Sequence, residues 1–213
     1  MCGRYALETP LEKLPQQIQD KLSPTHQKHY EQRSLIRPTE PVLTLRKEES
    51  KTQASLMLWG LLPSWSKNPF HKDLPKPFNA RAETINDKEF FKGAWRHHRC
   101  LIPASCFYEK GHRIKPTNEA TFWLAGIWDR WTGSDGSELD SCTIITTEPN
   151  SLIKPLHNRM PVIIPNGLEE EWISSVKNAQ ELKALKPLMT KWDPDEWKAE
   201  PKNKPDTNQL SFL

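Results

Sequence analysis

The most distinctive chemistry in this sequence belongs to Cys2, which follows Met1 directly. A small residue at position 2 favours removal of Met1, by an aminopeptidase or by autoproteolysis, so we expect the mature chain to begin at Cys2. An N-terminal cysteine offers an amine that can condense with an aldehyde and a thiol that can then close a five-membered thiazolidine ring. A lone terminal cysteine is more often an ordinary buried residue, so its neighbours decide between these readings.

Two other side chains are candidates for moving protons. Glu109 ends the run Cys106-Phe107-Tyr108 and is its only carboxylate, and a glutamate beside aromatic rings suits general acid–base work. The alternative is an exposed charge at a strand end. His157 starts a polar loop, where a histidine is more often a surface residue than a catalyst.

Polar side chains also recur at alternate positions in Asn79-Ala80-Arg81-Ala82-Glu83, so that in an extended segment they would share one face. The stretch from Trp59 to Trp65 leads into a loop rich in Lys and Pro that continues to Pro77. An aromatic and basic loop of this kind can line a groove for nucleic acid, whereas an ordinary surface loop anchored by its tryptophans is the simpler alternative.

Four potential metal ligands, His97, His98, Cys100 and Cys106, lie close together in the sequence. Their spacing is not that of a zinc ribbon or finger, and no second ligand pair follows, so we predict no metal site. The chain also has no Walker A loop, no G-x-G-x-x-G and no G-x-S-x-G. We therefore expect no cofactor.

The elements that must position these residues are mainly short strands. Patterns of apolar residues predict strands over residues 4–7, 42–45, 54–58, 100–103, 106–109, 121–127, 142–147 and 162–164. A helix is predicted from Thr9 as N-cap with Pro10 at its first position. Further helices are predicted around residues 90–95 and over 150–156, 169–176 and 179–185, with an irregular segment over 187–213. This order favours one α+β domain, residues 1–213, with a large, mostly antiparallel sheet.

Composition limits the class of protein. The chain has 213 residues, 36% of them hydrophobic, with nine tryptophans and seven phenylalanines, which argues for a folded core rather than disorder. No apolar run reaches the roughly 20 residues that span a bilayer, and four cysteines make no disulfide framework in a chain of this length. We expect a soluble cytoplasmic protein, nuclear if its source is eukaryotic. A net charge of +3 permits an anionic partner without requiring one.

Taken together, these fragments resemble the SRAP family, the SOS response-associated peptidases, which shield abasic sites in DNA. The matching segments follow the order of the family and lie at residues 1–4, 59–65, 79–84, 100–109, 144–147 and 157–162. An N-terminal Cys-Gly-Arg combined with Asn-Ala-Arg-x-Glu and His-x-Arg-Met-Pro is a highly specific set.

The resemblance implies a distorted β-barrel-like sheet with peripheral short helices. It also implies that Cys2 captures an abasic site in single-stranded DNA as a thiazolidine, without cofactor, in a monomer that acts in the DNA damage response. Within that reaction Asn79 holds the α-amine, Glu109 moves protons during imine formation, and His157 assists opening of the deoxyribose ring. The DNA-binding residues implied or added by this reasoning are Arg4, Arg37, Pro38, Trp65, Arg81 and Arg159.

The chain departs from the family pattern near several of these residues. Ser34-Leu35-Ile36-Arg37-Pro38 replaces the usual Tyr-Asn-x-Ala-Pro, so that Arg37 could add a phosphate contact. Cys106 stands where glycine is common, and Lys110 where tryptophan is usual. Two alternatives stay open: a peptidase that uses the Cys2 thiol, and a non-covalent binder of single-stranded DNA that uses Trp65 and the arginines.

Overall fold

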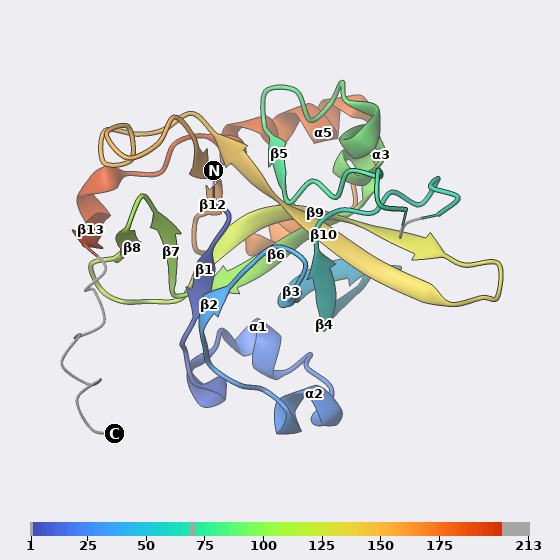
Figure 1. Cartoon of the computed structure of the whole chain (residues 1–213), viewed down its shortest axis with the longest axis horizontal. Helices are drawn as coiled ribbons and strands as arrows, with labels where there is room; N and C mark the ends of the chain where they lie inside the picture. The colour runs from blue at the N-terminus through green and yellow to red at the C-terminus, as the bar shows by residue number, and fades with distance from the viewer. Residues whose placement is uncertain (1, 69–70, 202–213) are drawn as a thin grey trace.

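Two sheets form the framework of the computed structural model, which describes residues 2–68 and 71–201 (Figure 1). The smaller sheet has the strand order β13-β8-β7-β1-β2 with antiparallel neighbours throughout. Its strands are β1 (Tyr5–Leu7), β2 (Arg33–Ile36), β7 (Cys106–Glu109), β8 (His112–Pro116) and β13 (Trp197–Pro201). This sheet carries the start of the described chain, because β1 lies between β7 and β2.

The larger sheet has the order β11-β10-β4-β3-β6-β9-β12, and β5 pairs with β10. Because β10 also pairs with β9, the strands β10, β4, β3, β6 and β9 close into a small barrel. Among the strand pairings of the described residues, only those of β10 with β4 and with β5 are parallel. The strands are β3 (Pro41–Glu48), β4 (Lys51–Trp59), β5 (Asn79–Arg81), β6 (Arg99–Ala104), β9 (Phe122–Thr132), β10 (Glu138–Thr147), β11 (Met160–Pro161) and β12 (Ile163–Ile164).

Two of the barrel strands, β6 and the first part of β9, are buried on both faces, which explains their long apolar runs. All six residues of β6 are buried, and so are the first seven of β9. Side chains on one face fill the barrel, while α3 (Glu89–His97) and α4 (Glu169–Ile173) cover β6 and β9 from outside. Large aromatic side chains such as Trp95, Trp128 and Trp172 supply much of this core. The predicted α+β fold, with a distorted, mostly antiparallel barrel and peripheral short helices, is confirmed.

The helix predicted from Thr9 is wrong. A short 3-10 helix, η1 (Leu11–Lys13), comes first, and α1 (Gln16–Gln19) begins only after Pro15, which cannot donate the backbone hydrogen bond that would continue η1. The Thr9 hydroxyl caps neither helix. It lies 3.0 Å from the Ser105 hydroxyl and 2.5 Å from the Thr121 hydroxyl, which ties the segment after β1 to the larger sheet. A second short helix, α2 (Pro24–Lys28), follows.

Two further predictions need correction. The helix predicted over residues 150–156 is a series of turns over 151–156. The Asn150 side chain caps it by accepting a hydrogen bond from the Ile153 amide (3.0 Å), but Pro155 has no amide hydrogen with which to continue a regular ladder. The segment after 187 is not irregular throughout, because β13 completes the smaller sheet by pairing with β8. Before β13, the chain forms α5 (Ala179–Ala184), η2 (Lys186–Met189) and η3 (Pro194–Glu196). Residues 202–213 lie outside the described part of the chain.

Every strand predicted from the sequence is present, and the helices around residues 90–95, 169–176 and 179–185 are present with shorter or shifted bounds. Within residues 2–68 and 71–201, no helix has the length and apolar character needed to cross a membrane.

Candidate active site

Cys2 lies where the two sheets meet, just before β1. Its side chain is buried, with 1% of its surface exposed, and its carbonyl oxygen accepts a hydrogen bond from the Asn79 side-chain nitrogen (3.1 Å). Asn79 is the first residue of β5, which β10 holds in register by pairing Asn79 with Ile144. The structure therefore joins the predicted nucleophile, on the smaller sheet, to the predicted positioning residue, on the larger one.

The side-chain oxygen of Asn79 has no hydrogen-bond donor among the described residues. This atom, Oδ1, is buried. A buried amide oxygen without a donor is costly, so such atoms are uncommon in folded proteins. The site thus holds an acceptor that a further donor beside Cys2 would satisfy.

Glu109 approaches Cys2 through the pairing of β1 with β7. Tyr5 lies opposite Phe107, and the Tyr108 amide donates to the Arg4 carbonyl (2.9 Å), so the same register leads Glu109 toward the residues before β1. Burial and then the negative charge of Glu109 raise the pKa of the Cys2 thiol to about 12. Because the field of Glu109 reaches the thiol, the two groups are neighbours, and the thiol is protonated at neutral pH.

His157 is half-buried in the loop before β11. Its Nδ1 accepts a hydrogen bond from the Arg159 amide (2.9 Å), so the proton of the neutral ring is on Nε2. The loop is anchored by the bond from the His157 amide to the Ile153 carbonyl (2.8 Å). His157 shares a cavity with Lys110, the residue after Glu109, and so lies on the Glu109 side of the site.

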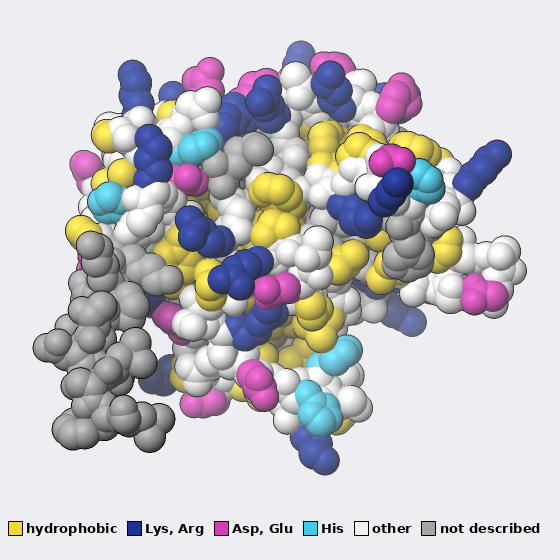
Figure 2. All heavy atoms as spheres, viewed as in Figure 1, with side chains coloured by type: hydrophobic (Ala, Val, Ile, Leu, Met, Phe, Trp, Pro, Cys, Tyr) yellow, Lys and Arg dark blue, Asp and Glu magenta, His cyan; other side chains and the backbone are white. Residues whose placement is uncertain are grey.

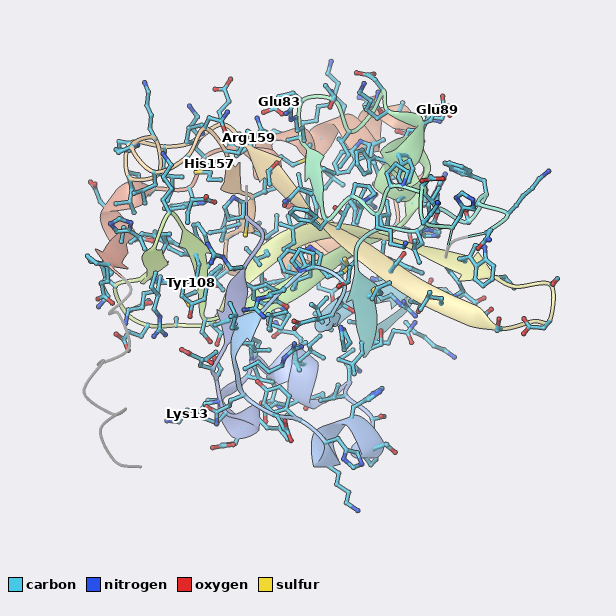
Figure 3. The ribbon with its side chains drawn as sticks, viewed as in Figure 1. Lys13, Glu83, Glu89, Tyr108, His157 and Arg159 are labelled. Carbon is cyan, nitrogen blue, oxygen red and sulfur yellow. The ribbon has the colours of Figure 1, made fainter. Side chains whose placement is uncertain are left out.

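Arg159 is bound by the protein itself. Its two terminal nitrogens each lie 2.8 Å from an oxygen of Glu83, and one of them also donates to the Thr146 carbonyl (2.6 Å). Figure 3 shows Arg159 between His157 and Glu83. Burial raises the pKa of Glu83, but the hydrogen bond and charge of Arg159, together with a backbone hydrogen bond and the charge of Arg81, outweigh burial and hold that pKa below its usual value. The sequence singled out Arg159 for phosphates and did not foresee this ion pair.

The alternating spacing of Asn79, Arg81 and Glu83 was the one signal that placed Glu83 near the site. The structure keeps only part of that pattern, because β5 ends at Arg81 and Glu83 lies in the turn that follows. Glu83 therefore reaches Arg159 from a turn and not from an extended strand.

The other predicted DNA-binding residues lie at the surface. Arg4, Arg37 and Arg81 are exposed, and Pro38 is half-buried. Figure 2 shows Lys and Arg side chains gathered over β1 and β2, and Arg4 directly precedes β1 while Arg37 directly follows β2. Trp65 is 60% exposed, with its ring 5.6 Å from that of Phe90 in an edge-on arrangement.

The four potential metal ligands lie in different surroundings. His98 stacks on Trp128 with ring centres 4.4 Å apart, while Cys100 and Cys106 are buried in strands of different sheets. In the described ranges no group of three or more His, Cys, Asp or Glu side chains is arranged to hold a metal ion.

Comparisons with known proteins identify the family of this chain. The profile of the family described as "SOS response associated peptidase (SRAP)" matches residues 1–204. The abasic site processing protein YoaM of Bacillus subtilis is 34% identical over 209 residues, which cover 93% of this chain and 89% of that protein. The abasic site processing protein HMCES of Xenopus tropicalis is 26% identical, over 79% of this chain and 60% of that protein.

Solved structures show the same fold. A crystal structure of a protein from Bacteroides thetaiotaomicron superposes with a TM-score of 0.76 at 23% identity, covering 93% of this chain and 90% of that one. A protein from Bordetella bronchiseptica gives a TM-score of 0.73 at 22% identity, covering 93% of this chain and 98% of that one. With its barrel, its buried Cys2 and a match over nearly its whole length, this chain belongs to the SOS response-associated peptidase (SRAP) family.

Proposed function

We propose that this protein, once Met1 is removed, binds single-stranded DNA and forms a covalent thiazolidine between Cys2 and an abasic site. The observation that carries the proposal is the hydrogen bond from Asn79 to the Cys2 backbone, in a buried position within the field of Glu109. The names of the relatives, abasic site processing proteins, agree with this substrate. Such a crosslink would shield the lesion during the DNA damage response.

The first step is opening of the sugar. An abasic deoxyribose is mostly a closed hemiacetal, so the bond between C1′ and O4′ must break while O4′ gains a proton and the C1′ hydroxyl loses one. His157, whose neutral ring carries its proton on Nε2, is suited to donate to O4′. The product is an aldehyde at C1′.

The second step is attack by the amine of Cys2 on that aldehyde. The amine adds to C1′ to give a carbinolamine, which loses water to leave an imine, and Glu109 is placed to accept and return the protons. The unpartnered Oδ1 of Asn79 offers the acceptor that this amine needs, beside the carbonyl that the same side chain already holds. An amine is present at Cys2 only when Met1 is absent.

The third step closes the ring. The Cys2 sulfur bonds to C1′, and the thiol proton passes by way of Glu109 to the former imine nitrogen, so the whole reaction releases one water. Burial raises the pKa of the Cys2 thiol and so favours its protonated form, which supports an order in which the amine of the mature chain acts first. The same protonated, buried thiol disfavours the alternative of a thiolate peptidase.

Binding of the strand falls to the exposed residues around the site. Arg4, Arg37 beside Pro38, and Arg81 are available for phosphates, while the exposed ring of Trp65 can stack on any base. We assign Arg159 a different part, since Glu83 holds its guanidinium and its backbone amide fixes the His157 ring.

The test is a crosslinking assay with single-stranded DNA that carries one abasic site. The mature protein should form a heat-stable adduct whose mass is the sum of protein and DNA less one water. Cys2→Ala retains the terminal amine and loses the thiol, so it can form only an imine, which heat reverses and borohydride traps. Equal amounts of heat-stable adduct from Cys2→Ala and wild type would overturn the proposal.

Cys2→Ser and intact DNA complete the design. The serine variant should resemble Cys2→Ala and yield an adduct only after borohydride reduction. A non-covalent binder would hold intact and abasic strands equally and give no adduct with either, whereas crosslinking requires the aldehyde.

A further inference from the structure

A cavity of about 560 Å³ is lined in part by His157. Three lysines, Lys110, Lys154 and Lys191, line it together with Asn158. They come from three separate segments: the turn between β7 and β8, the turns at 150–156, and the residues after η2. The fold therefore gathers positive charge at this place from positions that are distant in sequence.

Few negative charges oppose these lysines. Among the described residues, the one carboxylate that lines the cavity is Glu148, which lies 3.4 Å from the Lys191 ammonium, with both side chains about half-exposed or more. An exposed pair of this kind contributes at most about 1 kcal/mol. Lys110 and Lys154 form no salt bridge with a carboxylate of residues 2–68 or 71–201. The cavity is thus suited to an anion.

The backbone at Lys110 supplies an independent argument. Lys110 and Gly111 form the two-residue turn between β7 and β8, with φ angles of 43° and 76°. Positive φ at both positions favours Gly, Asn or Asp, and a lysine there is strained. Its side chain nevertheless lines the cavity, one position after Glu109, and strained backbone of this kind clusters at functional sites.

We propose that Lys110, Lys154 and Lys191 bind the phosphodiester backbone of the DNA strand on one side of the abasic site. This inference rests on the proposed function, because His157 belongs both to the cavity and to the site where the lesion reacts. A strand whose abasic sugar lies between Cys2 and His157 continues past His157 on this side and past Arg81 on the other. The three ammonium groups then hold the phosphates that follow the lesion in one direction only.

The test compares two triple variants. In the first, Lys110→Asn, Lys154→Gln and Lys191→Gln remove the cavity charges, and asparagine suits the positive φ at position 110 better than lysine, so folding is preserved. In the control, Lys21→Gln, Lys28→Gln and Lys51→Gln remove the same charge from exposed positions around α1, α2 and the start of β4. Crosslinking is measured against DNA concentration with abasic strands that are full-length or shortened on the 5′ or the 3′ side.

We expect the cavity variant to need about 10-fold more full-length DNA for half-maximal crosslinking than the control, with the maximal rate unchanged and a smaller salt dependence. Shortening the strand on one side should bring wild type down to the level of the variant, whereas shortening it on the other side should leave their difference intact. Equal behaviour of the two triple variants would overturn the inference. So would a difference that both truncations reduce equally, since that indicates general attraction rather than a site on one flank.

Two further measurements distinguish this inference from the proposed crosslinking function and from binding of a free anion. Fluorescence anisotropy with intact single-stranded DNA detects the cavity without crosslinking, so a wild type that binds but never crosslinks defeats only the proposed function. Inorganic phosphate is the probe for a free anion. Crosslinking is then measured with a strand too short to reach the cavity. If phosphate inhibits the wild type but not the cavity variant under these conditions, the cavity binds free phosphate, and the assignment of the cavity to the DNA backbone is overturned.

Discussion

The arginines of the barrel and those around Cys2 differ in what surrounds their guanidinium groups. Arg99, at the start of β6, is 1% exposed and donates to the carbonyls of Trp95 (2.8 Å) and Trp172 (2.9 Å). Arg46 is bound by Asp140 and Glu48 and lies over the Trp128 ring. Around the site, Arg4, Arg37 and Arg81 are exposed, and none forms a salt bridge with a described carboxylate.

This difference separates two uses of one residue type. A buried guanidinium has lost its water, so the protein must satisfy most of its donors and the group becomes part of the framework, although Arg46 Nε has no acceptor among the described residues. An exposed one is satisfied by water and can exchange that water for a phosphate at little cost to the fold. Arg159 stands between the two groups, because it lies at the site and yet is bound by Glu83. The following predictions test this division, beginning with the largest effect.

Replacing Arg99 should destabilise the protein severely. Its guanidinium satisfies carbonyls at the end of α3, on Trp95 and Arg96, and others in and after α4, on Trp172 and Ser174. Arg99→Met removes these donors and leaves buried carbonyls unsatisfied, so we expect the free energy of unfolding to fall by about 3–5 kcal/mol. Urea denaturation measures it. A loss below about 1 kcal/mol would show that the barrel does not depend on this arginine.

Replacing Arg81 should leave stability nearly unchanged and weaken DNA binding. Arg81→Gln removes an exposed charge at the end of β5, so its stability in urea should stay within about 0.5 kcal/mol of wild type. Affinity for single-stranded DNA should fall by about 3- to 10-fold, and the slope of its salt dependence should decrease by about one. Anisotropy titrations at several salt concentrations measure both. Unchanged affinity with reduced stability would place Arg81 in the framework instead.

The ion pair of Glu83 with Arg159 should give the smallest effect, visible as a dependence on pH. Because the pKa of folded Glu83 lies below its ordinary 4.5, the pair contributes stability above that pH and loses it as the pH falls through the lower folded value. Glu83 is 43% exposed, so solvent screening limits the contribution to less than about 1 kcal/mol. Thermal unfolding of wild type and Glu83→Gln should therefore converge at acid pH and differ at neutral pH. A constant difference would contradict this assignment.

Much of the fold could be predicted because its strands are long apolar runs bounded by polar turns. Residues 100–103 and 121–127 indicate strands by themselves, and both are central in the barrel. The helix predicted from Thr9 failed because a local helix signal competed with hydrogen bonds to residues distant in the sequence. Thr9 carries the signature of a helix cap, yet its hydroxyl contacts Ser105 and Thr121, residues about a hundred positions away.

The sequence by itself determined the family and supplied Cys2 and the residue types of the proposed chemistry, because these depend on specific residues in a specific order. Only the tertiary structure decided which of those residues meet. It placed Asn79 against Cys2 through the parallel pairing of β5 with β10, gave Arg159 to Glu83, and gathered three lysines beside His157. Contacts of this kind form when strands distant in sequence pair in a closed barrel, and no pattern among near neighbours in the chain encodes them.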